Sequence, residues 1–391
     1  MDLNEFFRRI NYVTLKLTNG CNLKCTYCNV EALTPQTPKM SLDLFKQVAR
    51  LLIENSQSPF VGLEFHGGEP MLLPDEFFEE AVAFARPLAR RHRKHVEFPL
   101  VTNGTLLTEE RLLKLNKLGI QWCMSCDGPP HINDLLRSSG RAVQRAIGLF
   151  QKHRIYCGLI TVMSHANYDK MSEVMGWYRD IGVFDFRVNY LQPQGRGFDE
   201  QLLTGEQMFE GLHQIIDHMY ETDVAVHEAE SASHIERFVE GRDPAKPLTC
   251  WEYQCQAGRT YVAVDLLGRI HACGTDLVNH VVGHVHQPFD EQHYKQKLAK
   301  LHDKGDWVIR CFDCPAQQIC NHSCSTSDYN SDQYKEHECD FTRRLWTYLC
   351  EHPERAYRVH EVIRSRQRPR AGEFVSLSDV ELSAVMQESS V

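Results

Sequence analysis

Apolar and polar positions alternate along the first half of the chain in a way that predicts strands and helices in regular succession. Six short apolar runs are candidate strands: Tyr12–Leu17, Val61–Phe65, Val96–Val101, Gln121–Ser125, Gly158–Met163 and Asp185–Leu191. Between them, apolar residues recur at helical spacing over Leu42–Glu54, Asp75–His92, Glu109–Leu118, Ala142–His153 and Met171–Ile181. Strands that alternate with helices in this way are typical of βα units around a parallel sheet.

The loops that follow these candidate strands hold unusual residues. In chain order they carry the cysteines Cys21, Cys25 and Cys28, then His66-Gly67-Gly68-Glu69-Pro70, Thr102-Asn103-Gly104-Thr105, Ser125-Cys126-Asp127-Gly128-Pro129 and Gln192-Pro193. In α/β barrels the reactive face is built from the loops at the carboxyl ends of the strands. The order of these motifs therefore predicts a single active face that collects residues from five of the six strand exits.

Composition limits the class of protein. The chain has 391 residues, enough for two domains, and its net charge of -9 argues against general binding to nucleic acid or to a membrane surface. The segment from Met1 to Gly20 lacks the apolar core of a signal peptide, and no apolar run reaches transmembrane length, so we expect a cytoplasmic protein. Fifteen cysteines in that reducing compartment indicate metal binding rather than disulfides.

The cysteine triad carries the strongest signal. Cys21, Cys25 and Cys28 form a C-x3-C-x2-C run, which offers three thiolates and is one ligand short of a closed zinc or cubane site. A zinc site completed by a distant fourth ligand is the alternative. The run, with Tyr27 at the aromatic position, resembles the motif of the radical S-adenosylmethionine (radical SAM) superfamily. That resemblance implies a [4Fe–4S] cluster whose open iron chelates the amino and carboxylate groups of SAM.

The same resemblance implies the residues that bind SAM. Gly67-Gly68-Glu69-Pro70 resembles the GGEP motif, whose backbone and glutamate hold the SAM amino group, although such a sequence by itself predicts only a turn. Ser125 and Arg137 resemble the contacts to the ribose and carboxylate of SAM, although Arg137 could instead form a surface ion pair. Asp127 could shape its loop or touch the substrate. The expected cofactor-binding residues are Tyr27, Gly67, Gly68, Glu69, Pro70, Asn103, Ser125 and Arg137.

Eight further cysteines lie in the C-terminal third of the chain. Their spacing, with the G-x4-C element Gly268 to Cys273 and the later C-x2-C-x5-C-x3-C run, resembles a SPASM domain, which carries two auxiliary [4Fe–4S] clusters. The resemblance implies that this chain ligates the clusters as the family does. One cluster would then be bound by Cys250, Cys255, Cys273 and Cys324, and the other by Cys311, Cys314, Cys320 and Cys339. Two four-cysteine zinc sites are the alternative. Cys123, Cys126, Cys157 and Cys350 remain, and we expect buried thiols that pack as small hydrophobes.

The predicted architecture is α/β: a partial (β/α)6 TIM-like barrel followed by a cysteine-rich SPASM domain. We divide the chain into residues 1–235, the barrel with a helical connector, and residues 236–391, the auxiliary-cluster domain with a polar tail. Strands seven and eight of a full barrel cannot be identified in the sequence.

The resemblance also implies the reaction. SAM on a reduced cluster yields a 5′-deoxyadenosyl radical, and fully ligated auxiliary clusters would accept an electron, which suits a net oxidation. Family members of this type mostly act on peptides. We therefore expect a maturase that cross-links side chains of a ribosomally made precursor peptide, with an electron donor such as flavodoxin or ferredoxin as a second partner. A formylglycine-generating anaerobic sulfatase maturase and a peptide epimerase are the alternatives.

Two departures bear on that choice. Sulfatase maturases usually have Gln before GGEP, where this chain has His66, and they place an Asp base directly after the G-x4-C cysteine, where this chain has Gly274. Asp276, two positions on, is the candidate general base, although a loop residue without a catalytic role fits the local composition as well.

Overall fold

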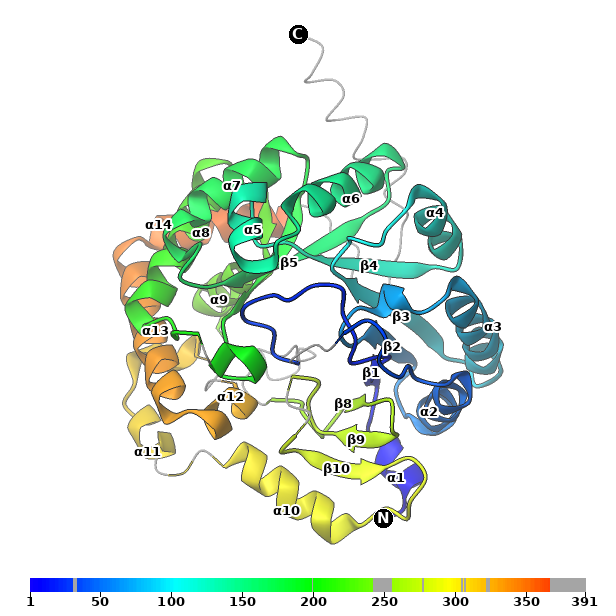
Figure 1. Ribbon diagram of the computed structural model, residues 1–391. Coiled ribbons are helices and arrows are strands. Elements are labelled where there is room, and N and C mark those ends of the chain that lie inside the picture. The colour runs from blue at the N-terminus through cyan, green and yellow to red at the C-terminus, as the bar shows by residue number, and fades with distance from the viewer. Residues whose placement is uncertain are drawn as a thin grey trace.

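A parallel sheet with helices on its outer face forms the centre of the molecule in the computed structural model (Figure 1). The structure describes residues 1–30, 34–198, 200–241, 255–275, 278–303, 305, 307–320 and 324–365. The six predicted strands are all present: β1 (Tyr12–Lys16), β2 (Phe60–His66), β3 (His95–Thr102), β4 (Ile120–Ser125), β5 (Cys157–Met163) and β6 (Asp185–Tyr190). They pair in chain order and in parallel, so the predicted α/β fold with a parallel sheet is confirmed.

The helices between these strands follow the predicted amphipathic segments. They are α2 (Leu42–Asn55), α3 (Asp75–Arg91), α4 (Glu109–Lys117), α6 (Gly140–Lys152) and α7 (Met171–Asp180), to which the structure adds the short α1 (Leu3–Phe7) and α5 (Pro130–Arg137). Ser41 caps α2, because its side chain accepts a hydrogen bond from the backbone N–H of Leu44. The apolar face of α2, including Phe45 and Leu52, is buried against the sheet.

The segment after β6 is mostly helical. It contains α8 (Gly205–Glu221), a two-residue strand β7 (His227–Glu228) that pairs in parallel with β6, and α9 (Ala229–Glu240). Glu228 caps α9 by accepting hydrogen bonds from the N–H groups of Glu230 and Ser231. The predicted division between residues 235 and 236 falls inside this helix.

The cysteine-rich region adds a small antiparallel unit to the edge of the same sheet. β8 (Tyr261–Val264), β9 (Arg269–His271) and β10 (Val281–His284) form a meander, and β8 pairs in parallel with β1, with Thr14 opposite Ala263. The sheet order is β10-β9-β8-β1-β2-β3-β4-β5-β6-β7. The two predicted regions therefore share one sheet, and β8 takes the place beside β1 where the sequence offered no strand.

Helices complete the C-terminal region. They are α10 (Glu291–His302), α11 (Trp307–Cys311), α12 (Ser325–Asn330), α13 (Asp332–Glu351) and α14 (Pro353–Ser365). α13 packs on α8, and α14 packs on both α8 and α9. The cysteine-rich region is thus anchored to the barrel at two places, through β8 at one edge of the sheet and through α13 at the other (Figure 1).

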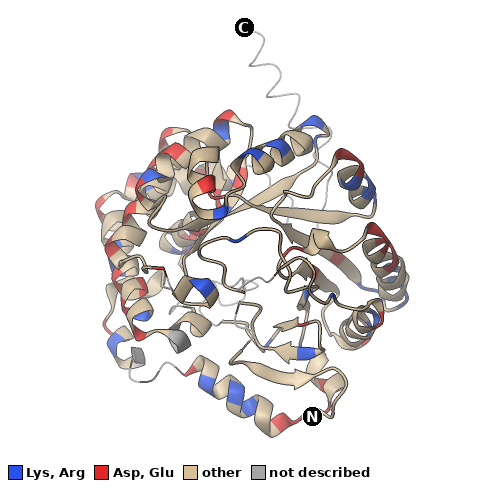
Figure 2. Cartoon of the chain, viewed as in Figure 1, with Lys and Arg blue, Asp and Glu red and all other residues tan. Residues whose placement is uncertain are grey.

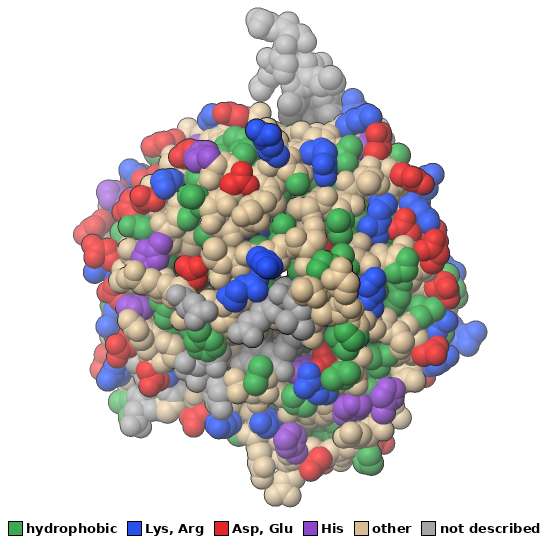
Figure 3. Space-filling view, in the orientation of Figure 1, with side chains coloured by type: hydrophobic (Ala, Val, Ile, Leu, Met, Phe, Trp, Pro, Cys, Tyr) green, Lys and Arg blue, Asp and Glu red, His purple; other side chains and the backbone are tan. Residues whose placement is uncertain are grey.

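Charged side chains of both signs are spread over the outer helices (Figure 2). The face seen in Figure 3 likewise has acidic and basic side chains interspersed around its rim. Among the described residues, no helix is both long and apolar enough to cross a bilayer.

Candidate active site

The three cysteines of the N-terminal triad lie in the loop that follows β1. Cys25 is buried, and Cys21 and Cys28 are half-buried. Burial raises the pKa of the Cys21 thiol to about 11 and also raises the pKa of Cys25. Thiols in such surroundings hold a negative charge only beside a cation, so this donor set fits a metal centre.

Two other loops hold the triad loop in place. The Thr26 N–H donates to the carbonyl of Leu136 at 3.0 Å. From the loop after β6, Arg196 donates its backbone N–H to the Cys28 carbonyl and its Nε to the Cys25 carbonyl, both at 2.9 Å. The segments that follow β1, β4 and β6 therefore meet at the triad, as the order of the motifs predicted.

The two glycines of the GGEP motif allow a close approach between backbones. The N–H of Gly68 donates to the Thr18 carbonyl at 2.7 Å, and that of Glu69 donates to the Gly20 carbonyl at 2.8 Å. A Cβ atom on Gly68 would lie 2.0 Å from the Gly20 carbonyl oxygen, and Gly67 has a φ of 136°, which favours glycine. These glycines bring the motif against the segment that leads into the cysteine triad.

Glu69 is fully buried and its carboxylate accepts three hydrogen bonds from the protein. Oε1 accepts from the Met71 N–H at 2.9 Å and from the Thr102 hydroxyl at 2.8 Å, and Oε2 accepts from the Asn103 N–H at 2.7 Å. Burial raises the pKa of Glu69, and these hydrogen bonds oppose the rise. Pro70 begins a short 3-10 helix, Pro70–Leu72, that this carboxylate caps.

Asn103 connects this carboxylate to the triad. Its side-chain Nδ2 lies 3.6 Å from the Cys21 sulfur and donates to the Asn22 Oδ1 at 3.0 Å. Glu69 therefore fixes the backbone at Asn103, and the Asn103 side chain in turn faces the first cysteine.

Tyr27, Asp127 and Arg137 form a buried polar group beside the triad. The Tyr27 hydroxyl donates to Asp127 Oδ2 at 2.5 Å, and Arg137 Nη1 donates to the Tyr27 oxygen at 2.6 Å. Asp127 also accepts the Val162 N–H at 2.9 Å. Asp127 thus shapes the loop after β4, and Arg137 is an interior residue rather than one half of a surface pair.

One of the predicted SAM contacts, Arg137, has an unused hydrogen-bonding group. The Nε of Arg137 is buried and has no hydrogen-bond partner among the described residues, and Ser125, the last residue of β4, is half-buried there. A buried guanidinium N–H without a partner fits an anionic ligand group such as a carboxylate.

The structure also brings in residues that sequence reasoning missed. Lys16, at the end of β1, is 2% exposed, and its Nζ lies 3.4 Å from the Nδ1 of His66. His66 Nδ1 accepts the Gly67 N–H at 2.7 Å, so its ring is neutral at that nitrogen. Burial, opposed by Glu64 and by Cys273 and Cys28, lowers the pKa of Lys16 to about 8. A charged residue within an apolar strand was the sequence signal that could have identified Lys16.

Three cysteines expected to share one auxiliary cluster lie near one another. Cys273 is buried, and Cys255 and Cys324 are half-buried. Burial, with the nearby Cys273 and Cys255 adding to it, raises the pKa of Cys324 to about 12. Cys250, the fourth expected ligand, and Asp276, the candidate base, lie outside the described residues.

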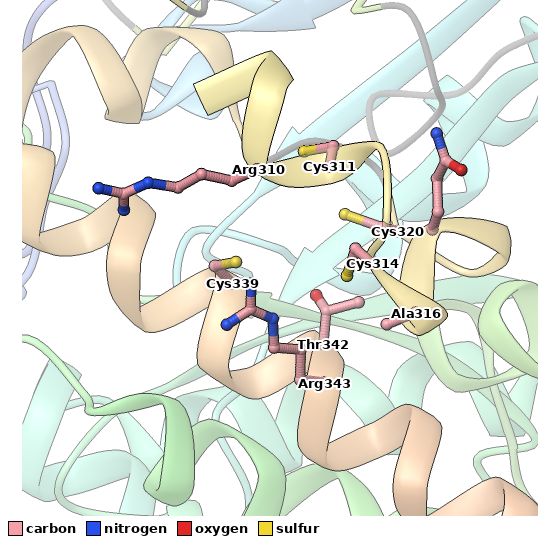
Figure 4. A pocket seen from close by; sticks show the side chains of 9 residues that line it. Arg310, Cys311, Cys314, Ala316, Cys320, Cys339, Thr342 and Arg343 are labelled. Carbon is pink, nitrogen blue, oxygen red and sulfur yellow. The ribbon is translucent and has the colours of Figure 1, made fainter. Parts of the chain in front are cut away.

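The four cysteines expected in the other auxiliary cluster line a single cavity (Figure 4). Cys311, Cys314, Cys320 and Cys339 come from α11, the loop after it and α13, and Arg310 and Arg343 stand beside them. The space among them is about 370 Å³, including space open to solvent. Within the described residues no three potential ligands converge on one point as they would around a single ion. Thiols spread around a cavity fit a multi-iron cluster, which is larger than one ion.

The remaining cysteines differ from one another. Cys126 is buried, as expected, and Cys123 and Cys157 are half-buried. Cys350, next to the C-terminal residue of α13, is exposed, so the expectation of a buried thiol is wrong there.

Comparison with known proteins agrees with this geometry. Residues 15–178 match the family model described as "Radical SAM superfamily". The "AdoMet-dependent heme synthase" of Nitratidesulfovibrio vulgaris is 24% identical over 344 residues, which cover 81% of this chain and 88% of that protein. The "Cysteine-type anaerobic sulfatase-maturating enzyme" of Clostridium perfringens is 28% identical over 222 residues, which cover 52% of this chain and 58% of that protein.

A solved structure shares the fold. "Native anSMEcpe with bound AdoMet and Cp18Cys peptide" superposes with a TM-score of 0.69 at 19% identity, over 88% of this chain and 99% of that chain. The matched family region contains the cysteine triad, the GGEP motif and Arg137, which are the groups that converge in the structure. Residues 15–178 are therefore a radical SAM domain, and the chain is an enzyme that shares its fold with this solved structure.

Proposed function

We propose that this enzyme is a radical SAM/SPASM maturase that oxidises a ribosomally made precursor peptide and joins two of its side chains. The observation that carries the proposal is the pair of additional cysteine groups, one around Cys273 and Cys324 and one lining the cavity of Figure 4. These cysteines would hold two auxiliary [4Fe–4S] clusters, which would provide the electron acceptors that a net oxidation needs, and the triad would hold a third cluster that binds SAM. Similarity to a sulfatase-maturating enzyme, and to a structure that holds a peptide, supports a peptide as the substrate class.

Cys21, Cys25 and Cys28 would hold the cluster to which SAM binds, and SAM there would supply the radical chemistry that removes a hydrogen atom from the substrate. The chain's own residues bind and orient the reactants. Glu69 and Asn103 hold the loop that faces Cys21, and Arg137 directs an unused N–H toward an anionic group of SAM. Lys16, which is buried, and His66, which is half-buried, lie next to each other at the ends of β1 and β2, and we assign them a contact with the substrate. Asp276 remains the proposed base.

Gly274 argues against the formylglycine reaction. A Cβ atom there would lie 2.7 Å from the Tyr261 hydroxyl and 3.4 Å from Lys16 Cε. An acidic side chain directly after Cys273 would therefore displace the Tyr261 side chain and contact the aliphatic part of the Lys16 side chain. This crowding favours a reaction that does not use a base at position 274.

The proposal has two tests. Iron and sulfide are counted per chain after anaerobic reconstitution, and about 12 irons are expected for three cubanes. The enzyme is then co-expressed with candidate precursor peptides encoded beside its gene, and the peptides are examined by mass spectrometry. A loss of about 2 Da, absent with a Cys21/Cys25/Cys28→Ala variant, supports an oxidative cross-link. Solvent deuterium uptake without a mass loss would instead indicate epimerisation.

A haem-forming activity is the second candidate. The haem synthase relative is matched over more of its length than the sulfatase-maturating relative, 88% against 58%. Haem formation by the purified enzyme, with no modified peptide, would favour this candidate. In either case we propose an external electron donor of the flavodoxin or ferredoxin kind, because SAM cleavage consumes an electron.

A further inference from the structure

Two threonines contact the sulfur atoms of two cysteines in the C-terminal region. The Thr275 hydroxyl oxygen lies 3.1 Å from the Cys273 sulfur, and the Thr326 hydroxyl oxygen lies 3.2 Å from the Cys324 sulfur. The two hydroxyls are 3.2 Å apart. Each threonine is two residues after its cysteine, so two separate segments make the same contact and meet in the middle.

The direction of these hydrogen bonds follows from counting protons. A thiolate can only accept a hydrogen bond, and each hydroxyl has one proton to donate. Gln194 Nε2 donates to the Thr326 oxygen at 3.1 Å, so when both cysteines are cluster-bound thiolates that each accept one hydrogen bond, the Thr326 proton goes to the Cys324 sulfur. The Thr275 proton then serves the Cys273 sulfur. Thr326 is 1% exposed and Gln194 is 3% exposed, so water cannot readily replace these partners.

Gln194 connects this group to the triad through a single loop, residues 191–198. Arg196, two residues on, donates to the carbonyls of Cys25 and Cys28. The loop after β6 therefore contacts the triad loop on one side and the Thr326 hydroxyl on the other. Its position explains why Gln194 is buried at a strand exit.

The second cysteine group has different neighbours. Thr342 lines the cavity of Figure 4, but its hydroxyl donates to the Glu338 carbonyl at 2.8 Å. Arg310 and Arg343 line the same cavity. Neutral hydroxyls thus contact sulfur at one site, whereas guanidinium groups stand beside the other.

We propose that Thr275 and Thr326, with Gln194 holding Thr326, are positioning residues that set the reduction potential of the cluster bound by Cys255, Cys273 and Cys324. The inference rests on the proposed cofactor set. Reduction adds negative charge to a cluster and its sulfurs, so donors to sulfur stabilise the reduced form and raise the potential. Removing the hydroxyls should lower it.

The test uses the full chain with Cys21, Cys25 and Cys28 replaced by Ala, so that the triad contributes no signal. This parent and its variants are reconstituted, their iron is counted, and they are titrated with dithionite under electron paramagnetic resonance. The variants are Thr275→Val, Thr326→Val and both together. Thr326→Ser keeps the hydroxyl, and Thr342→Val is the matched control beside the other cysteine group.

The expected result is a shift of one cluster only. At a fixed potential the double variant should show an oxidised-to-reduced ratio about tenfold higher, which is about 59 mV for a one-electron couple. Thr326→Ser and Thr342→Val should titrate like the parent. A double variant with about 8 irons and an unchanged titration would overturn the inference while leaving the cofactor set intact.

Two further outcomes also decide the question. A parent that holds only about 4 irons would overturn the cofactor set and this inference together. If the valine variants do not assemble the cluster, Gln194→Leu provides the measurement, because it leaves every thiol and hydroxyl in place. The reduction potential of the cluster in this variant should fall by less than in the double valine variant, because the Thr275 hydroxyl would then donate to Thr326. An unchanged reduction potential would overturn the inference.

Discussion

The barrel and the cysteine-rich region place their functional groups by different means. In the barrel, the polar groups lie where parallel strands end, and hydrogen bonds within the protein hold them, as in the three bonds to Glu69 and the Tyr27–Asp127 pair. In the cysteine-rich region, the thiols lie on loops and helices, and two attachments hold the region: β8 beside β1 and α13 on α8. The barrel should therefore keep its site without metal, whereas the second region should depend on its ligands.

The largest effect should come from the triad. Replacing Cys21, Cys25 and Cys28 by Ala should abolish SAM cleavage, because no other described residues offer the same three thiols at the strand exits. The iron content should fall from about 12 to about 8 per chain. Circular dichroism should be unchanged, since the barrel's hydrogen bonds do not involve the metal. A loss of barrel structure in this variant would contradict the comparison.

Removal of the cavity cysteines should impair substrate oxidation much more than SAM cleavage. Replacing Cys311, Cys314, Cys320 and Cys339 by Ala should also remove about 4 irons, but SAM cleavage should stay within about threefold of the parent. Substrate oxidation should fall at least about a hundredfold, because the proposed path for the second electron would be lost. Limited proteolysis should detect cleavage near α11 in this variant first. Equal losses of SAM cleavage and oxidation would show that the regions are not separable.

Glu69→Gln should weaken the barrel site. The amide has an N–H₂ group where the carboxylate accepts hydrogen bonds from Met71, Thr102 and Asn103, so at least one donor is left facing another donor. The free energy of unfolding should fall by about 1–3 kcal/mol, and SAM affinity should fall about tenfold. Urea denaturation and calorimetric titration measure the two effects. Glu80→Gln, an exposed change on α3, is the control and should have neither effect.

Asp265→Asn should have the smallest effect, and it tests how the β8–β9 turn is held. Hydrogen bonds from His271 and Arg269 lower the pKa of Asp265 to about 2, despite burial that raises it. The stabilisation is therefore complete above the ordinary value of 3.8 and is lost as the pH falls through about 2. The variant should lose about 2 kcal/mol at neutral pH and show less acid sensitivity between pH 4 and 2.

Denaturation curves at several pH values provide that measurement. Asp180→Asn, an exposed aspartate on α7, is the matched control, and its stability should change by less than about 0.5 kcal/mol. If both variants behave alike, Asp265 does not stabilise the turn.

The sequence by itself determined the parts that depend on local pattern. Strand and helix periods located β1 to β6 and the helices between them, because side-chain direction repeats every 2 or 3.6 residues. The order of the strands then placed the triad, the GGEP motif and Asn103 at one edge, since parallel strands end together. The grouping of Cys311, Cys314, Cys320 and Cys339 around one cavity also followed from spacing and resemblance.

Only the tertiary structure decided the contacts between distant segments. Four contacts join residues that are at least 100 positions apart: the pairing of β8 with β1, the proximity of Lys16 to Gly274, the contacts of Tyr27 with Asp127 and Arg137, and the bond from Gln194 to Thr326. No local period encodes such pairs, because each depends on how the sheet curves and on which loop packs against which. The strands could be predicted from the sequence because the side of a strand on which a residue lies depends on its position in the local alternation. The distant residue that a side chain contacts depends instead on the whole fold.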